Sequence, residues 1–380
     1  MKSFFLISSH ILALSVTGQY QITFIIDSAP VKKNADYFLA GSFNRWDPGN
    51  EDYRFQNQVG TYTLTVSLLP GQYEYKITRG SWATVEVHDD FESLPNRILS
   101  VNSDTTIHIK IGAWADERPE VVKNVSGTAS GSVHILDTAF YMPQLGRYRR
   151  VWIYLPKGYS TSKKKYPVLY MQDGQNVFDV STSYSGEWGV DEFLDTLCKN
   201  CRESIVVAVD NGAERRMNEY NPWSFQDFGK GEGNQYVDFM VKTLKPYIDA
   251  HYRTLKSKKY TSVAGSSMGG LISLYAVLKY PKIFGSAGIF SPAFWTASGI
   301  SNTIITRSKK MKSELFFYAG GKESESMIPD MEKVEQCIRK LSKSEIKEIV
   351  DEDALHNEAA WRKHFSEFYQ WVFCNEKKIN

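Results

Sequence analysis

The amino-acid sequence predicts an α/β protein in two parts: a small β-sandwich, and then a mostly parallel sheet with helices on both faces. Residues 19–112 hold short runs in which apolar and polar residues alternate without a helical period, a pattern typical of a sandwich. Residues 131–376 alternate strand-like and helix-like segments, which is typical of a parallel sheet. Residues 113–130 are rich in Asp, Glu, Pro, Ser and Gly, so we expect a linker between the two parts.

The composition is that of an ordinary globular protein. The 380 residues, 42% hydrophobic and 23% charged, suit roughly two to three domains with a sizeable buried core. The formal net charge is +2, so bulk electrostatics implies no nucleic acid or other polyanionic partner. Aromatic residues reach 14%, which fits surfaces that stack on sugar rings and β-rich cores equally well.

The first 18 residues have the pattern of a secretory signal peptide. Lys2 precedes an apolar stretch at 4–16, which is too short to span a bilayer, and small residues follow at 17–18. We therefore expect a mature chain that begins at Gln19 and is secreted or periplasmic. A buried first strand or an uncleaved anchor is the alternative. No later segment has the pattern of a transmembrane helix.

The cysteine pattern indicates no metal or redox centre. Cys198 and Cys201 form a pair without a second pair at zinc spacing, and Cys337 and Cys374 stand alone. Disulfides are compatible with export, but the spacing leaves their pairing open. We expect neither a metal nor an organic cofactor.

Local patterns place the individual elements. In the first part, strands are predicted at 20–26, 62–66, 71–77 and 106–111. In the second part, strands are predicted at 150–155, 167–171, 205–209, 260–264, 286–290 and 315–319. Helices are predicted at 191–197, 236–248, 268–279, 327–341 and 358–373.

The strongest functional signal is the turn between the strand at 260–264 and the helix at 268–279, which reads Gly265-Ser266-Ser267-Met268-Gly269-Gly270. A Gly-x-Ser-x-Gly turn between strand and helix is the nucleophile elbow of serine hydrolases. It predicts Ser267 as the nucleophile and the Met268 N–H as an oxyanion donor. The alternative is a glycine-rich helix start that packs closely or holds a phosphate.

The base is expected after the nucleophile, because hydrolases of this kind carry Ser, acid and His in that chain order. Only His356 and His364 follow Ser267. His364 falls within a helical pattern, whereas His356 lies in an acidic loop before it and can reach over the strand ends. We therefore predict His356 as the base.

The acid is expected in the loop after the strand at 315–319. Glu323 is the first carboxylate there, with Glu325 and Asp330 as fallbacks. Its predicted task is to hold the imidazole tautomer and stabilise the imidazolium. The second oxyanion donor is expected in the loop after the strand at 167–171, from the N–H of Gln175 or alternatively of Gly174.

Several motifs spread over residues 131–376 carry a family resemblance. They are Pro167-Val-Leu-Tyr-Met-Gln-Asp-Gly-Gln-Asn, Asp210-Asn-Gly, Arg215-Arg, Asn218-Glu-Tyr-Asn-Pro-Trp, Ala264-Gly-Ser-Ser-Met-Gly-Gly, Phe290-Ser-Pro-Ala-Phe-Trp and His356-Asn-Glu-Ala-Ala-Trp. Together they resemble the esterase branch of the α/β-hydrolases, with its enterochelin, feruloyl and acetyl-xylan esterases and S-formylglutathione hydrolase. The resemblance implies the α/β-hydrolase fold, Ser267 and His356 as triad members, and supports Glu323.

The first part resembles a starch- or glycogen-binding module of the immunoglobulin-like type. The resemblance rests on Gly41-Ser-Phe-Asn-Arg-Trp-Asp-Pro, Tyr75-Lys-Ile, Gly80-Ser-Trp and Pro95-Asn-Arg-Ile. It implies Trp46, Lys76, Trp82 and Asn96 as the residues that contact an α-glucan or another polysaccharide. The alternative is that these tryptophans pack the sandwich and that the module is a rigid docking piece.

The sequence therefore predicts a secreted serine carboxylic-ester hydrolase that works through an acyl-enzyme. The loop at 211–232, with Arg215, Arg216 and Trp223, is expected to line the pocket; the arginines can pair with a carboxylate or catecholate, or form surface or structural ion pairs. Feruloyl or acetyl esters of plant polysaccharides are the favoured substrates, and a siderophore trilactone of the enterochelin type is the alternative. An acyltransferase, or a non-catalytic glycan-binding protein, remains the competing hypothesis.

Overall fold

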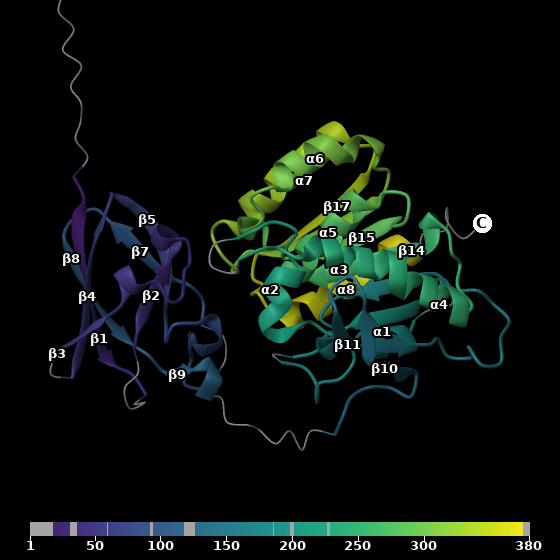
Figure 1. Cartoon of the computed structure of the whole chain (residues 1–380), viewed down its shortest axis with the longest axis horizontal. Coiled ribbons are helices and arrows are strands. Elements are labelled where there is room, and N and C mark those ends of the chain that lie inside the picture. The colour runs from purple at the N-terminus through teal and green to yellow at the C-terminus, as the bar shows by residue number, and fades with distance from the viewer. Residues whose placement is uncertain are drawn as a thin grey trace, which may run out of the picture. The chain divides into compact units, whose positions relative to one another are not determined.

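The computed structural model describes residues 18–30, 36–58, 60–91, 94–117, 126–184, 186–197, 201–225 and 229–374. The chain divides into two compact units, Met1–Val121 and Val122–Asn380, which can be followed in Figure 1. All but the last residue of the predicted signal peptide lies outside the described residues. None of the helices within these ranges is both long and apolar enough to cross a membrane.

The first unit consists of two facing sheets and a short strand pair. One sheet has the order β3-β4-β1-β8 and the other β2-β5-β7, while β6 pairs with β9. The strands are β1 (Tyr20–Ser28), β2 (Phe38–Gly41), β3 (Gln56–Gln58), β4 (Thr61–Leu68), β5 (Gly71–Thr78), β6 (Glu86–Val87), β7 (Arg97–Val101), β8 (Thr105–Lys110) and β9 (Ala113–Trp114). Alternate apolar residues of both sheets, such as Phe24 of β1 and Ile77 of β5, point into one shared core. Two sheets that pack face to face in this way form a β-sandwich.

The expected linker at 113–130 is shorter than predicted. Trp114 is completely buried in the sandwich core, and its ring stacks on Tyr37 at 5.3 Å between centroids. At the other end, Thr128 Oγ1 donates to Glu187 of the second unit at 2.6 Å. Residues 118–125 lie outside the described residues, and the division between the two units falls within this range. Composition does not show that Trp114 packs inside the sandwich, because that contact depends on the tertiary structure.

The second unit is built on one sheet with the order β10-β11-β13-β12-β14-β15-β16-β17. Its strands are β10 (Val133–Met142), β11 (Arg147–Tyr154), β12 (Val168–Met171), β13 (Ile205–Val209), β14 (Thr261–Ser266), β15 (Ser286–Phe290), β16 (Glu314–Gly320) and β17 (Glu345–Asp351). Pairing is parallel from β13 through β17, and the hairpin β10–β11 joins the sheet antiparallel at one edge. The six predicted strands are present; β10 and β17 were not predicted.

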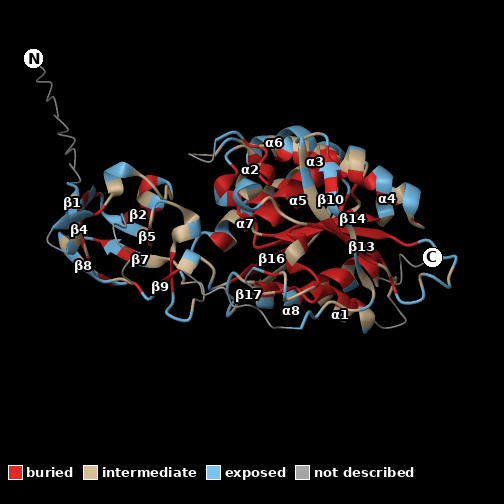
Figure 2. Ribbon diagram, turned by 60° about the horizontal axis from the view of Figure 1, so that its bottom comes forward, coloured by how far each residue is buried: buried red, intermediate tan, exposed pale blue. Residues whose placement is uncertain are grey.

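Helices cover both faces of this sheet. They are α1 (Val190–Asp195), α2 (Arg216–Glu219), α3 (Gly233–Phe239), α4 (Lys245–His251), α5 (Met268–Lys279), α6 (Ile300–Arg307), α7 (Met327–Leu341) and α8 (Glu358–Phe373). One apolar core packs the helices α3, α4, α5, α6 and α7 against one face of the sheet. A second core packs α1 and α8 against the other face. Figure 2 shows these two sets on opposite sides of the buried sheet. The predicted helix at 236–248 is α3 and α4 joined by a π-helical turn at Met240–Leu244.

In this arrangement the carboxyl ends of the parallel strands β12, β14, β15, β16 and β17 lie at one edge of the sheet. In open parallel sheets, ligands bind at that edge. The loops that leave it carry Gln175, Ser267, Glu323 and His356.

Candidate active site

The turn at Gly265–Gly270, predicted to carry the nucleophile and called the nucleophile turn below, has the tight geometry that its glycines indicate. Ser267 lies between β14 and α5 with φ 57° and ψ −120°, a strained conformation for a residue with a side chain. A Cβ added at Gly265 would lie 2.8 Å from Gln172 Cγ, and one at Gly270 would lie 2.8 Å from the Phe290 carbonyl oxygen. Any larger residue would push the turn away from β12 or β15, so the glycines are required by packing.

The structure pairs the predicted base with the predicted acid. His356 Nδ1 lies 2.8 Å from Oε2 of Glu323, the first carboxylate of the loop after β16. The Glu323 side chain is 1% exposed and that of His356 is 37% exposed. Because an ionised carboxylate only accepts hydrogen bonds, Nδ1 carries the proton of the neutral ring and Nε2 is left as the acceptor.

The second oxygen of Glu323 is held by a residue that sequence reasoning missed. Ser291 Oγ donates to Glu323 Oε1 at 2.6 Å, and the Gly320 N–H donates to the same oxygen at 2.7 Å. Ser291 Oγ accepts in turn from the Trp361 indole N–H at 2.8 Å. Ser291 directly follows β15 and has φ 42°; the motif Phe290-Ser-Pro was visible, but nothing local in it indicated a carboxylate partner.

Backbone hydrogen bonds join the nucleophile turn to this pair. The Ser267 N–H donates to the Phe290 carbonyl at 2.8 Å, and the Ala293 N–H donates to the Ser267 carbonyl at 3.1 Å. Ser291 lies between these two contacts along the chain. Among the described residues no hydrogen bond links Ser267 Oγ directly to His356. Nucleophile–base contacts of substrate-free enzymes are often long and tighten only when substrate is bound.

The two predicted oxyanion donors are Met268, within the nucleophile turn, and Gln175, in the loop after β12. Met268 is the first residue of α5, so its N–H has no partner within the helix. Gln175 lies in the short 3₁₀-helix Gly174–Asn176, where its side-chain Oε1 accepts from the Asn211 N–H at 3.1 Å and its carbonyl from Thr182 Oγ1 at 2.8 Å. In the described part of the chain neither N–H donates to a protein acceptor. Both can therefore donate to a substrate oxygen.

An ion pair between Arg216 and Asp173 connects the loop after β12 with the nucleophile turn. Arg216 Nε and Nη2 donate to the two oxygens of Asp173 at 2.6 and 2.9 Å, and Asn211 Nδ2 donates to Asp173 at 2.7 Å. Arg216 Nη2 also reaches the Ser266 carbonyl at 3.4 Å. The guanidinium therefore ties the oxyanion loop to the nucleophile turn, whereas the side chain of Arg215 is exposed.

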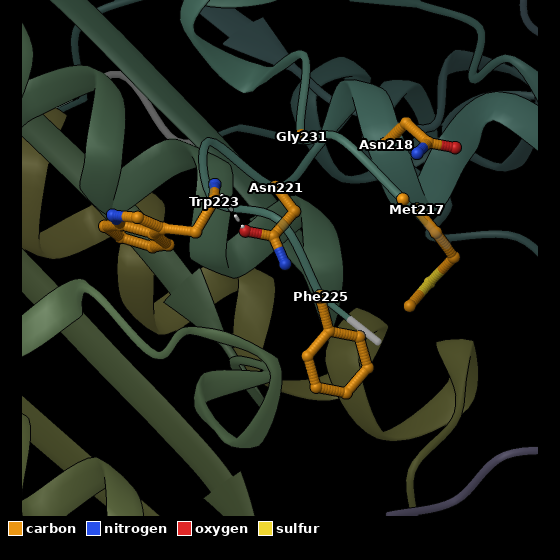
Figure 3. Close-up of a pocket in the computed structure, with 7 residues that line it drawn as sticks. Met217, Asn218, Asn221, Trp223, Phe225 and Gly231 are labelled. Atoms are coloured by element: carbon orange, nitrogen blue, oxygen red, sulfur yellow. Dashed lines mark hydrogen bonds between the residues drawn. The ribbon is translucent and has the colours of Figure 1, made fainter. Parts of the chain in front are cut away.

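Trp223 belongs to a wall beside the site. Its ring packs edge-on against Tyr275 at 5.6 Å between centroids, and its Nε1 would lie 2.0 Å from a Cβ added at Gly299. Figure 3 shows a narrow hollow next to it that is lined by Met217, Asn218, Asn221, Phe225 and Gly231. The described residues between 217 and 231 thus line this hollow, and Trp223 is mainly a packing residue there.

His364 has a role of its own. Its Nε2 lies 2.9 Å from Asp351 and its Nδ1 2.9 Å from Glu367, and its ring stacks on Tyr318 at 4.6 Å. Both ring nitrogens therefore have partners, and this side chain of α8 is buried against β16 and the end of β17. This agrees with the preference for His356.

The sugar-binding candidates gather within the first unit. The rings of Trp46 and Trp82 lie 6.2 Å apart with a tilt of 43°. Lys76 Nζ donates to the Leu94 carbonyl, and Asn96 Nδ2 donates to Glu74 at 2.8 Å. Burial lowers the pKa of Lys76 to about 8. The two indoles form a pair, while the two polar groups already have protein partners.

The fold and the strand-end loops define an α/β-hydrolase. Residues 143–371 match the model of the family described as "Putative esterase". Because this match covers more than half of the chain, the protein belongs to this esterase family and is a carboxylic-ester hydrolase.

Two relatives show the range of the family. YbbA of Bacillus subtilis, an uncharacterized protein, is 27% identical over 241 residues, which are 59% of this chain and 92% of YbbA. The endo-1,4-beta-xylanase/feruloyl esterase of Xylanibacter ruminicola is 24% identical over 247 residues, which are 63% of this chain but only 31% of that enzyme.

Two solved structures share the fold. The BES protein from Bacillus cereus has a TM-score of 0.52 at 18% identity and covers 64% of this chain and 95% of its own. The siderophore hydrolase EstB from Aspergillus nidulans has a TM-score of 0.50 at 18% identity, covering 63% and 95%. At this identity the likeness concerns the fold alone.

Proposed function

We propose that the chain is a serine esterase in which Ser267 is the nucleophile, His356 the general base and Glu323 the group that orients the base. The observation that carries this proposal is the 2.8 Å hydrogen bond between His356 and the buried Glu323. It lies at the sheet edge where Ser267 occupies a strained turn. The three residues follow the chain order of α/β-hydrolases.

The reaction then proceeds through an acyl-enzyme. His356 Nε2 takes the proton of Ser267 Oγ as that oxygen attacks the ester carbonyl, and the Met268 and Gln175 N–H groups stabilise the tetrahedral oxyanion. His356 returns the proton to the leaving alcohol. Water, activated by the same ring, releases the acid and restores Ser267.

The decisive test compares two serine variants on p-nitrophenyl acetate. Ser267→Ala is expected to lose about 10⁴-fold or more in kcat. Ser301→Ala changes an exposed serine of α6 and serves as the matched control, with activity close to wild type. Ser267→Ala that keeps its activity, while binding the same substrate, would disprove the assignment of the nucleophile.

We infer an apolar rim beside the nucleophile from two exposed side chains, and such a rim favours an ester with an aromatic acyl group. Trp295 and Leu355 are each 46% exposed. Trp295 lies two residues after Ala293, whose N–H contacts Ser267, and it packs edge-on against Phe225 at 5.4 Å. Leu355 precedes His356. We therefore propose feruloyl esters of plant polysaccharides ahead of acetyl esters, in line with the feruloyl esterase among the relatives.

The rim can be tested by changing Trp295. Trp295→Ala is expected to lower kcat/KM about tenfold for methyl ferulate, since an aromatic contact contributes roughly 1 kcal/mol beyond its buried area, and to leave p-nitrophenyl acetate unaffected. Equal effects on both esters would contradict an acyl-group contact.

A siderophore trilactone is the second candidate substrate. It is favoured by Arg215, whose exposed guanidinium could meet a catecholate, whereas Arg216 is neutralised by Asp173. Turnover of a catecholate trilactone that exceeds turnover of methyl ferulate and falls in Arg215→Ala would select this candidate.

For the first unit we propose binding of a polysaccharide through Trp46 and Trp82, with Lys76 and Asn96 as polar contacts. The support is the pair of indoles, since tryptophan faces stack on sugar rings. Retention on insoluble starch and xylan should fall in Trp46→Ala relative to wild type. Equal, negligible retention of both proteins would leave the unit as a scaffold, and binding without any esterase activity would favour the non-catalytic alternative.

We further propose that the protein is exported. The signal-like residues 1–18 motivate this, and a disulfide between Cys201 and Cys374 supports it, because disulfides persist in oxidising compartments. Cys337 is a free thiol, and Cys198 lies outside the described residues. Detection of the mature chain starting at Gln19 outside the cytoplasm would test both processing and location.

A further inference from the structure

A second cavity lies at the other edge of the α/β sheet, where β14, β15, β16 and β17 begin. Its volume is about 480 Å³, within the range of sites for small ligands. It is lined by residues that precede these strands and by the end of α8: Arg202, Lys258, Lys259, Tyr260, Gly285, Lys312, Ser313, Glu314, Lys343, Glu345, Val372 and Phe373. Since each strand rises about 3.3 Å per residue, the cavity lies about 20 Å from the nucleophile edge.

The lining is strongly cationic. Arg202, Lys258, Lys259, Lys312 and Lys343 outnumber the carboxylates, Glu314 and Glu345. Burial and the neighbouring Lys312 charge lower the pKa of Lys258, as expected where like charges are gathered. The net charge of +2 for the whole chain therefore conceals a local concentration of positive charge, and such a concentration in a concave site attracts anions.

The cationic wall is held in place by other contacts. Lys258 Nζ donates to the Lys312 carbonyl at 2.7 Å. The Arg202 guanidinium lies 5.1 Å from the centre of the Tyr260 ring. The Arg202 N–H donates to the Phe373 carbonyl at 3.0 Å, and the adjacent disulfide Cys201–Cys374 links the same two segments. These contacts limit the entropy that the side chains of Lys258 and Arg202 lose when a ligand binds.

We propose that this cavity binds a small polyanion, a molecule with two or more carboxylate, sulfate or phosphate groups, separately from the ester-cleaving centre. Its anionic groups would meet the ammonium groups of Lys312 and Lys343 and the Arg202 guanidinium. In a ligand with a carbon skeleton, that skeleton would lie against Val372 and Phe373. No part of this site takes part in the esterase mechanism, so the two functions can be lost independently.

Calorimetric titration of the full chain with citrate and with pyrophosphate tests this proposal. We expect saturable binding of at least one of them, weakened by added salt. Citrate as the tighter ligand would assign a carboxylate ligand, and pyrophosphate a phosphate ligand. Sucrose serves as the uncharged probe and should not bind here.

Matched charge variants locate the binding. Lys312→Gln/Lys343→Gln should weaken binding about tenfold or more, since hydrogen bonds to charged groups are the stronger ones. Lys309→Gln/Lys310→Gln removes the same charge from exposed residues outside the lining and should bind like wild type. Ser267→Ala should also bind like wild type. Absence of saturable binding by both anions, equal affinities of the two lysine variants, or loss of binding in Ser267→Ala would overturn the proposal.

Discussion

Replacing Ser291 by alanine tests how the acid of the site is held. The change removes the 2.6 Å hydrogen bond to Glu323 Oε1 and leaves only the Gly320 N–H on that oxygen. It also leaves the Trp361 indole N–H without its acceptor. A hydrogen bond to a charged group contributes about 1.5–3 kcal/mol. If the loss falls on the orientation of His356, kcat should drop about 10- to 100-fold.

Ser286→Ala is the matched control at the other end of the same strand. Ser286 is also buried, and its Oγ shares a 2.6 Å hydrogen bond with Ser262 Oγ. Both variants should lower the free energy of unfolding by about 1–3 kcal/mol, but only Ser291→Ala should lower kcat and move the pH profile of kcat/KM. The assay is p-nitrophenyl acetate hydrolysis per folded molecule, with stability measured by urea. Equal activities and unshifted pH profiles of the two variants would refute a positioning role for Ser291.

Three further changes have outcomes that follow from the structure. Burial, and next the charge of Glu348, raise the pKa of the buried Glu335 to about 7. Because a raised carboxyl pKa in the folded state makes stability fall as the pH rises from about 4.5 to about 7, Glu335→Gln should have its effect above this range. In urea unfolding, the variant should be more stable than wild type by at most about 3 kcal/mol at pH 8 and nearly equal to it at pH 4. Reduction of the disulfide, which closes a loop of 173 residues, should lower stability by about 5 kcal/mol on the chain-entropy model, and an unchanged melting temperature after reduction would contradict this. Arg216→Ala removes the cationic partner of the buried Asp173 and leaves the Asn211 amide as its donor, so it should lower the free energy of unfolding by about 3–5 kcal/mol. The exposed Arg215→Ala should change it by no more than about 0.5 kcal/mol, and equal losses in the two variants would contradict a stabilising role for the ion pair.

Much of the fold could be predicted because its signals are local. The helix at 268–279 and the strands at 205–209 and 286–290 were predicted with the bounds that the structure has, since apolar periodicity is a property of neighbouring residues. The edge strand β17 escaped prediction. Its sequence Glu-Ile-Lys-Glu-Ile-Val-Asp is only partly buried, and charged residues on an edge strand weaken the strand pattern.

The sequence by itself determined the nucleophile turn, because its glycines and the strand and helix around it are contiguous. It also ordered Ser267, Glu323 and His356 along the chain as candidates. Only the tertiary structure decided that Ser291 holds Glu323, that Arg216 pairs with Asp173, and that Cys201 joins Cys374. The physical reason is that these contacts cross between strands and loops 32 to 173 residues apart. Their partners are selected by the order of strands in the sheet, which no local pattern specifies.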